Sequence, residues 1–394
     1  MSSVDSSSDS RSSYFPNLSP SNSTTAPTLS SLDNHHLVNS PDAFGSCSHP
    51  SPTQQIAPFP PRELWARDCE LMHHYCTVTA DTLCVRKDLA YVWGVAIPRL
   101  GYQDPFVMHG ILAIAAAHKA YLVPANRKTY LPLADYHQTL GSEGYRRYLQ
   151  HYNMTNWMPV FGFASLVVLH MLTLPTRMDN CVLEDPITNL VELAGLLRGI
   201  KTTLEPAMGR IVRTEFAPVV FGIWVLGSDD EAERYPYPGC DLTWKEANPS
   251  YSCPSLENSS LPTDTWVALQ RLRAFQEAYI PASGLQHYTA ALEGLETSAR
   301  LFAAAGLHAE VAAAHFWLYI IDDSILIDLA AQRPHALLLF AHYLVHWAVF
   351  EKGFWFTRGW SRQVMVKIEE GLSGRPNFLE MMQWPKQMVA EAVV

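Results

Sequence analysis

Hydrophobic residues recur along most of the chain with the spacing of α-helices. Apolar side chains at every third or fourth position mark one face of a helix, whereas half-buried strands alternate apolar and polar positions. From "PRELWARDCELMHHY" onward, long segments of the first kind dominate and the alternating pattern is nearly absent. The pattern therefore predicts an all-α fold, a helical bundle over residues 61–394.

Two helix starts are marked by an aspartate followed by a proline. Asp104 precedes Pro105 in "DPFVMHGILAIAAAHKAYL", and Asp185 precedes Pro186 in "DPITNLVELAGLLRGI". A capping carboxylate and a proline in the first turn both favour a helix N-terminus. The second helix should bury one stripe, formed by Leu190, Leu193, Ala194 and Leu197.

Other segments are apolar on nearly all sides and should form the centre of the bundle. They are the helix after Asp104, residues 157–174 and residues 315–331. The runs 157–174 and 334–350 approach the length of a membrane span, but they carry histidines and lack basic flanks. We interpret them as core helices and expect no membrane span.

Two segments depart from the helical pattern. Residues 1–60 consist mainly of Ser, Pro, Asn and Thr, which bury too little apolar surface to offset the entropy of ordering, so we predict a disordered tail. Residues 228–264 are acidic and rich in proline, which indicates an extended connection between two helical groups. We favour one interrupted helical domain over two independent ones.

Charge and cysteine content narrow the functional classes. The formal net charge is −10, and nucleic-acid binding draws much of its affinity from Lys and Arg, so direct DNA binding by this chain is not expected. The seven cysteines have no regular spacing, and the N-terminus has no secretory signal. These features favour reduced thiols in a cytosolic or nuclear protein.

The run "CELMHHYCTVTADTLC" contains the strongest candidate metal ligands. At about 100° per residue, Cys69, His73 and Cys76 share a narrow helical stripe, with Cys84 near its edge. Three such ligands could in principle meet a metal ion.

The same stripe also fits a buried helix face. It continues through Met72, Ala80 and Leu83, while the adjacent His74 points away from it. Free cysteine packs as a small hydrophobe, and no close C-x₂-C pair occurs in the chain. We therefore interpret the stripe as one wall of the core and predict no metal site.

The acidic pair in "IIDDSILID" offers the one indication of an enzyme. All-α terpene cyclases hold magnesium-diphosphate with an aspartate-rich helix, but their carboxylates lie one turn apart, whereas Asp328 follows Asp322 and Asp323 by six and five positions. A helix bend, a cap or a hydrogen-bonded carboxylate is the preferred interpretation, with one aspartate paired to an Arg or His because an unpaired buried charge is costly.

Other catalytic apparatus is not visible. The sequence contains no G-x-S-x-G elbow, H-E-x-x-H, P-loop or glycine fingerprint after a strand. We interpret His109, His118 and His170 as core histidines with satisfied hydrogen bonds, or as residues lining a pocket. No individual catalytic, cofactor-binding or metal-binding residue is predicted, no cofactor is expected, and the sequence does not identify the ligand-binding residues.

Several motifs in order resemble a known family. They are "ELMHHY" (70–75), "IPRLGYQDPFVMHGILAIAAAHKA" (97–120), "YLPLADYHQTL" (130–140) and "LAGLLRGI" (193–200). Together they resemble the helical regulatory region of fungal zinc-cluster (Zn₂Cys₆) transcription factors, particularly the sterol uptake control type. The resemblance implies a nuclear protein whose helical region receives regulation and, in sterol-sensing members, holds ergosterol in an apolar pocket.

The DNA-reading part of that family is missing from this sequence. The zinc cluster requires a C-x₂-C pair and a basic loop, and residues 1–60 contain only Cys47 and scarcely a basic residue. Two explanations stay open: an upstream exon encodes the cluster, or the protein has lost its DNA reader and works through partners.

The sequence therefore predicts a non-enzymatic regulator of fungal transcription. It would control a sterol-responsive or specialised-metabolite gene set. The expected partners are a sterol or lipid-like ligand and a DNA-binding transcription factor, and monomer and homodimer are alternatives. A helical enzyme acting on a hydrophobic or prenyl substrate and a non-catalytic interaction scaffold are the competing hypotheses.

Overall fold

The computed structural model describes residues 57–153, 155–211, 213–221 and 253–393. Every regular element in these ranges is a helix and none is a strand, so the predicted all-α fold is confirmed. Of the two segments predicted to be irregular, residues 1–56 and 228–252 lie outside the described ranges. Residues 253–264 are non-helical, with turns at 257–258 and 263–264, and lead into the helix that follows.

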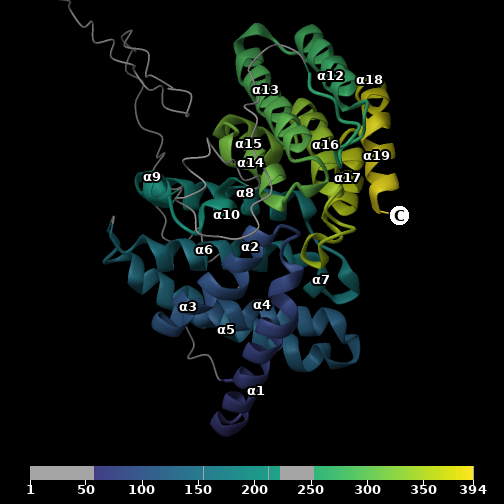
Figure 1. Cartoon of the computed structure of the whole chain (residues 1–394). Helices are drawn as coiled ribbons and strands as arrows, with labels where there is room; N and C mark the ends of the chain where they lie inside the picture. Colours follow the sequence, from purple (N-terminus) through teal and green to yellow (C-terminus); the bar gives the residue numbers. More distant parts are fainter. Residues whose placement is uncertain (1–56, 154, 212, 222–252, 394) are drawn as a thin grey trace, which may run out of the picture. The chain divides into compact units, whose positions relative to one another are not determined.

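The first group of helices packs around α4 (Figure 1). Helix α4 contacts α1, α3, α5, α6 and α7. The bounds are α1 (Pro61–His74), α2 (Lys87–Tyr91), α3 (Ile97–Gln103), α4 (Pro105–Leu122), α5 (Arg127–Leu149), α6 (Trp157–Leu172) and α7 (Leu174–Arg177).

The second group packs around α16, drawn in green and yellow in Figure 1. Its bounds are α12 (Thr265–Tyr279), α13 (Ala282–Ala305), α14 (Val311–Ile320), α15 (Asp323–Ala330), α16 (Pro334–Ala348), α17 (Trp360–Gly371), α18 (Pro376–Met381) and α19 (Gln383–Val393). Between the groups lie α8 (Pro186–Leu204), α9 (Met208–Ile211) and α10 (Ala217–Phe221). Helix α8 joins the groups, because it contacts α6 on one side and α14, α15 and α17 on the other.

Both predicted helix starts are confirmed, but only one aspartate caps with its side chain. Asp185 accepts a hydrogen bond from the backbone N–H of Thr188, at 3.1 Å. The Asp104 carboxylate makes no such bond; its backbone carbonyl accepts the N–H of Val107 instead, at 2.9 Å. The four apolar residues predicted to form the stripe of α8 are all buried.

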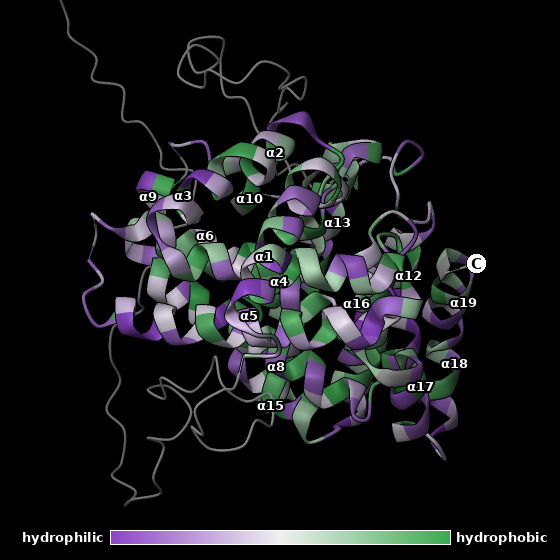
Figure 2. Cartoon of the chain, turned by 90° about the horizontal axis from the view of Figure 1, so that it is seen from below, coloured by the Kyte–Doolittle hydropathy of each residue, from purple (hydrophilic) through white to green (hydrophobic). Residues whose placement is uncertain are grey.

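The centre of each group is a helix that is apolar on all sides. Every residue from 336 to 348 of α16 is buried, and α4 and α6 are buried over most of their length. Outer helices such as α17 alternate hydrophobic and hydrophilic positions (Figure 2). None of the described helices combines the length and the apolar character that a bilayer crossing requires.

The segment 315–331, which apolar periodicity places among the central helices, is divided next to the acidic pair, where a bend or a cap was the preferred interpretation. It breaks at Ile321, which has an extended ψ of 144°, and a new helix begins at Asp323. Asp322 caps the new helix, because its carboxylate accepts the N–H of Ser324 at 2.8 Å. A short polar side chain that bonds to its own backbone competes with helix continuation, so apolar periodicity alone could not reveal the break.

Glycines allow α4, α5 and α6 to approach each other closely. A Cβ atom added at Gly141 would lie 2.6 Å from Cε2 of Phe163 and 3.1 Å from the backbone oxygen of Phe106. At Gly144 an added Cβ would lie 2.7 Å from Cβ of Phe106. Both positions therefore require the absence of a side chain.

Replacing Gly141 by alanine should destabilise the protein, since the added methyl group overpacks the junction of the three helices. We expect a loss of about 1–3 kcal/mol in the free energy of unfolding, measured by denaturant titration. Gly195→Ala in α8 is the matched control, because a Cβ there meets nothing within 4 Å. The control should gain about 0.5–1 kcal/mol from helix propensity. Equal effects at the two positions would contradict the close approach.

Candidate functional site

The cysteine-rich run beginning at Cys69 forms a wall of the core only in part: Met72, Ala80, Leu83 and Cys84 are buried or pack against the core, but the first part of the predicted stripe faces solvent. Cys69, His73 and Cys76 are exposed, and the buried face of this helix carries Leu71 and Tyr75 instead. Across the described parts of the chain, no group of three or more His, Cys, Asp and Glu side chains could hold a metal ion. Cys47, the one cysteine of the N-terminal tail, lies outside the described residues.

A change of helix type separates the later residues of the stripe from the earlier ones. The chain widens into a π-helical turn at Tyr75–Thr79 and then tightens into a 3₁₀ turn at Ala80–Thr82. These turns do not advance by 100° per residue, so positions before and after them lose their common face. Ala80 and Leu83 are buried for this reason, although a regular helix would place Ala80 on the same stripe as the exposed Cys69.

Helix α1 is fixed to α4 and α5 by the carboxylate of Glu70. This carboxylate accepts hydrogen bonds from Lys119 Nζ at 2.6 Å, Tyr130 Oη at 2.7 Å and Arg67 Nη1 at 3.0 Å. Partial burial opposes ionisation, but the three donors prevail and lower the pKa of Glu70 to about 2. The arrangement is a structural ion-pair network.

His118 is a buried histidine with a bonded ring, as the sequence predicted. Its Nδ1 lies 3.0 Å from Oγ1 of Thr79, and its ring stacks on Trp355 with centroids 4.5 Å apart. Burial, together with the nearby His74, lowers the pKa of His118 to about 4. The imidazole is therefore neutral near pH 7.

His109 forms a row with two residues that the sequence did not single out. Its Nδ1 lies 3.0 Å from Nδ1 of His137, and Nε2 of His137 lies 3.1 Å from Oδ1 of Asp68. One facing nitrogen must carry the proton and the other must accept it. Burial and the neighbouring ring lower the pKa of His109 to about 4. The row links α4, α5 and α1.

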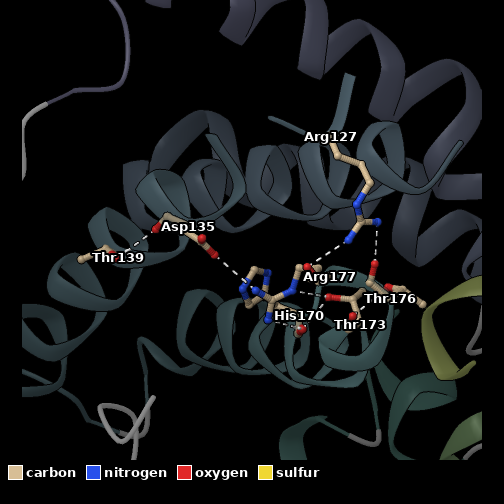
Figure 3. Close-up of polar contacts among 7 residues, drawn as sticks. All are labelled: Arg127, Asp135, Thr139, His170, Thr173, Thr176 and Arg177. Carbon is tan, nitrogen blue, oxygen red and sulfur yellow. Dashed lines mark hydrogen bonds and ion pairs between the residues drawn. The ribbon is translucent and has the colours of Figure 1, made fainter. Parts of the chain in front are cut away.

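His170 lies beside a polar network at the end of α6 (Figure 3). Its backbone oxygen accepts bonds from Thr173 Oγ1 at 2.7 Å and Arg177 Nη2 at 3.3 Å. Arg177 also pairs with Asp135 of α5 at 3.2 Å. Arg127 donates to the carbonyls of Thr176 and Arg177, at 2.8 and 3.0 Å. These bonds satisfy helix-end carbonyls and fix α7 against α5.

The acidic pair and Asp328 have separate partners. Asp323 pairs with Arg198 at 2.6 Å, Asp322 caps α15, and Asp328 accepts the hydroxyl of Tyr288 at 2.7 Å. The prediction of a cap and of a partner arginine is confirmed. The carboxylates do not converge. Asp322 caps α15, Asp323 pairs with a residue of α8, and Asp328 binds a residue of α13.

Glu310 connects the two helical groups through a buried carboxylate. Its Oε1 accepts the backbone N–H groups of Val85 at 2.8 Å and Arg86 at 2.9 Å. Arg86 in turn forms a buried ion pair with Asp88. Burial disfavours the charged carboxylate more than the bonds favour it, so the pKa of Glu310 rises to about 7.

Buried aromatic rings, several of which carry a polar atom, form a cluster around α16. Tyr343 stacks on Trp317 with centroids 4.6 Å apart, and Trp347 contacts Tyr343 at 6.2 Å, Trp360 at 5.7 Å and His315 at 5.2 Å. All five residues are buried. We call this set the α16 ring cluster.

Some polar atoms of the α16 ring cluster are bonded and others are not. Nε1 of Trp317 donates to the carbonyl of Ala291, and Nε1 of Trp360 donates to the carbonyl of Leu172, both at 2.7 Å. The other polar atoms have no protein partner: Tyr343 Oη, Trp347 Nε1 and His315 Nε2. They belong to a larger set of buried side-chain atoms without a hydrogen-bond partner, which near α16 also includes Nε2 of His346 and Oγ of Ser361.

The histidines around α16 are neutral hydrogen-bonding groups. Burial lowers the pKa of His315 and His342 to about 4 and that of His346 to about 3. Ser298 donates its hydroxyl proton to the carbonyl of Ala313, so Nδ1 of His346, 3.1 Å away, must donate to the serine oxygen. The three histidines of α14 and α16 thus contribute neutral hydrogen-bonding groups to this part of the interior.

The sequence carries one signal for the polar residues of α16, which the periodicity of apolar positions does not show. His342 and His346 lie four positions apart in an apolar helix, as do Tyr343 and Trp347. Such pairs share a helix face. His315 could not be assigned to the same place, because its contact with Trp347 joins two different helices.

Comparison with known proteins gives a partial match. No family model matches the chain. Over 52 residues, 13% of the chain, it is 40% identical to Sterol uptake control protein 2 of Candida albicans, and a match of the same length and identity is found to Sterol uptake control protein 2 of Saccharomyces cerevisiae. The matched stretch spans 7% and 6% of those proteins. The chain therefore has a distant, partial similarity to fungal sterol uptake control proteins.

The raised pKa of Glu310 should make stability depend on pH. Because the folded pKa of about 7 exceeds the usual value of 4.5, the native state binds this proton more tightly than the unfolded state. The contribution of Glu310 should therefore become more favourable as pH falls from about 8 to about 5, by roughly 1–3 kcal/mol. Glu310→Gln, which carries no titrating group, should lack this component when unfolding is followed across that range. Parallel pH profiles would contradict the shift.

Proposed function

We propose that this chain is a helical regulatory protein of fungal transcription that controls a sterol-responsive or specialised-metabolite gene set. The observation that carries the proposal is the 52-residue match to sterol uptake control proteins of two fungi. The all-helical architecture agrees with the helical regulatory region that the sequence motifs resemble. The match covers a small share of each protein, so the similarity is the finding and the role in gene regulation is our proposal.

The regulatory input in this proposal is a sterol or lipid-like molecule. Helices α4, α6 and α16 are apolar on all sides, and the polar groups around α16 are neutral. An interior of this kind suits a neutral, hydrophobic ligand. A ligand that binds one arrangement of the helices more tightly than another shifts the population between them, and this shift would be the signal.

The output in this proposal passes through a DNA-binding transcription factor in the nucleus. A net charge of −10 weakens attraction to the phosphate backbone, so DNA contact is assigned to the partner. The enzyme hypothesis receives less support, because Asp322, Asp323 and Asp328 serve a helix cap, an ion pair and a tyrosine hydroxyl.

A reporter assay tests the proposal. The full chain fused to a heterologous DNA-binding domain should change reporter expression in yeast when sterol synthesis is inhibited. A change of about fivefold or more is expected, the lower range of typical allosteric coupling. The DNA-binding domain alone, expressed at the same level, is the control. Equal reporter levels with and without the inhibitor would count against sterol-responsive regulation.

A further inference from the structure

Cys69 and His73 lie on the solvent-facing side of helix α1. They are four positions apart within one regular α-helix, so their side chains are neighbours on its surface, with Cβ atoms about 5–6 Å apart. Both side chains are exposed. The hydrogen bond that Thr77 makes to His73, at 2.8 Å, uses the backbone oxygen and not the imidazole. A thiol and an imidazole thus reach solvent side by side.

A thiol and an imidazole at this spacing can bind one metal ion together. Sulfur and imidazole nitrogen are ligands that zinc prefers, and tetrahedral bonds of about 2.3 Å to sulfur and about 2.0 Å to nitrogen place the two ligand atoms roughly 3.5 Å apart. Side chains that start from neighbouring positions on a helix can turn toward each other to reach this separation. The pair therefore forms two of the four corners of a zinc site.

Helix α1 is anchored to the core through its other faces. Leu71 and Tyr75 are buried, and the Glu70 carboxylate accepts hydrogen bonds from Lys119 of α4 and Tyr130 of α5. A site that is carried on a fixed helix holds its ligands more precisely than one on a loop. Cys69 and His73 are thus presented to solvent on a rigid support.

The chain supplies half of a zinc ligand set at this place. A structural zinc site has four protein ligands. Cys76 is also exposed, but it lies seven positions beyond Cys69, about 10 Å along the helix axis, so the two thiols cannot share an ion. In the parts of the chain that the structure describes, no group of three or more His, Cys, Asp and Glu side chains could hold a metal ion. A complete site therefore needs two ligands from a second molecule.

We propose that Cys69 and His73 of two copies of this chain bind one zinc ion, in a Cys₂His₂ site that joins the copies into a dimer. A two-fold axis through the ion repeats the same thiol and imidazole and so completes the four ligands. Each thiol loses its proton to solvent on binding, and the two thiolates neutralise the charge of the ion. The inference goes beyond the proposed function, because the transcriptional role requires neither a metal ion nor a second copy.

The surface beside the pair favours contact with a second copy. Trp65 lies one turn before Cys69 on the same side of α1 and is 70% exposed. Helix α1 lies at the outer edge of the first helical group (Figure 1), where another molecule can reach it. Contact between two copies would remove part of the indole ring from water, and this burial adds to the affinity that the ion supplies.

Sedimentation of the untagged full chain, kept reduced, tests the shared site. In EDTA the chain should sediment as a monomer of 44.2 kDa, and in zinc chloride its mass should double. The dimer isolated by gel filtration should hold one zinc ion for two chains, measured by elemental analysis. Cobalt chloride in place of zinc should give the visible absorption of a tetrahedral site with thiolate ligands.

Cys69→Ala and His73→Ala should each abolish the zinc-dependent dimer. Because both side chains are exposed, either variant should melt in EDTA at the same temperature as the parent chain. Cys76→Ala and Cys253→Ala are the matched controls, since each removes an exposed thiol outside the pair. Both controls should still form the dimer when zinc is added.

Several outcomes overturn the shared site. A chain that stays monomeric in zinc, or that binds one ion per chain, lacks it. A dimer that forms equally in zinc and in EDTA is held by other contacts. Loss of the dimer in Cys76→Ala but not in Cys69→Ala assigns the ion to a different thiol.

Discussion

The complete burial of α16 is the constraint on which the second half of the structure depends. A helix that is apolar on every side needs neighbours on every side, and α13, α14, α15, α17 and α19 supply them. Burial also removes the polar side chains of this helix from water, so each needs a partner inside the protein. His342 finds one in the carbonyl of Leu338 and His346 in Ser298, whereas Tyr343 and Trp347 do not. Burial of α16 thus stabilises this group of helices and also leaves some polar atoms of α16 without a partner.

The two helical groups are joined by a few bonds between residues far apart in the chain. Trp360 donates to the carbonyl of Leu172 at the end of α6, and Trp355 donates to Thr82 at 3.1 Å. Glu310 receives two backbone N–H groups from residues 85 and 86. Since Trp360 also contacts Trp347, a change in packing around α16 would act directly on the first group. The two groups are thus mechanically coupled through a single layer of side chains.

The ionisable groups buried in the described parts of the chain make structural hydrogen bonds and ion pairs. A general acid or base needs a pKa near the working pH and access to a substrate. Burial lowers the pKa of His118, His315, His342 and His346 to about 3 to 4, so these imidazoles are neutral near pH 7. Glu310 has a pKa of about 7, but it is buried and holds two backbone N–H groups.

The sequence by itself determined the helices, because helix periodicity and caps are local. It located the starts of α4 and α8, the stripe of α8, the all-round burial of α4 and α6, and α16 as a core helix. Tertiary structure alone decided the rest. Packing decided that Leu71 and Tyr75 face the core while Cys69 and His73 are exposed. The unpaired atoms of Tyr343, Trp347 and His315 depend on which helices meet, and no periodicity within one helix encodes the partner that a side chain finds on another.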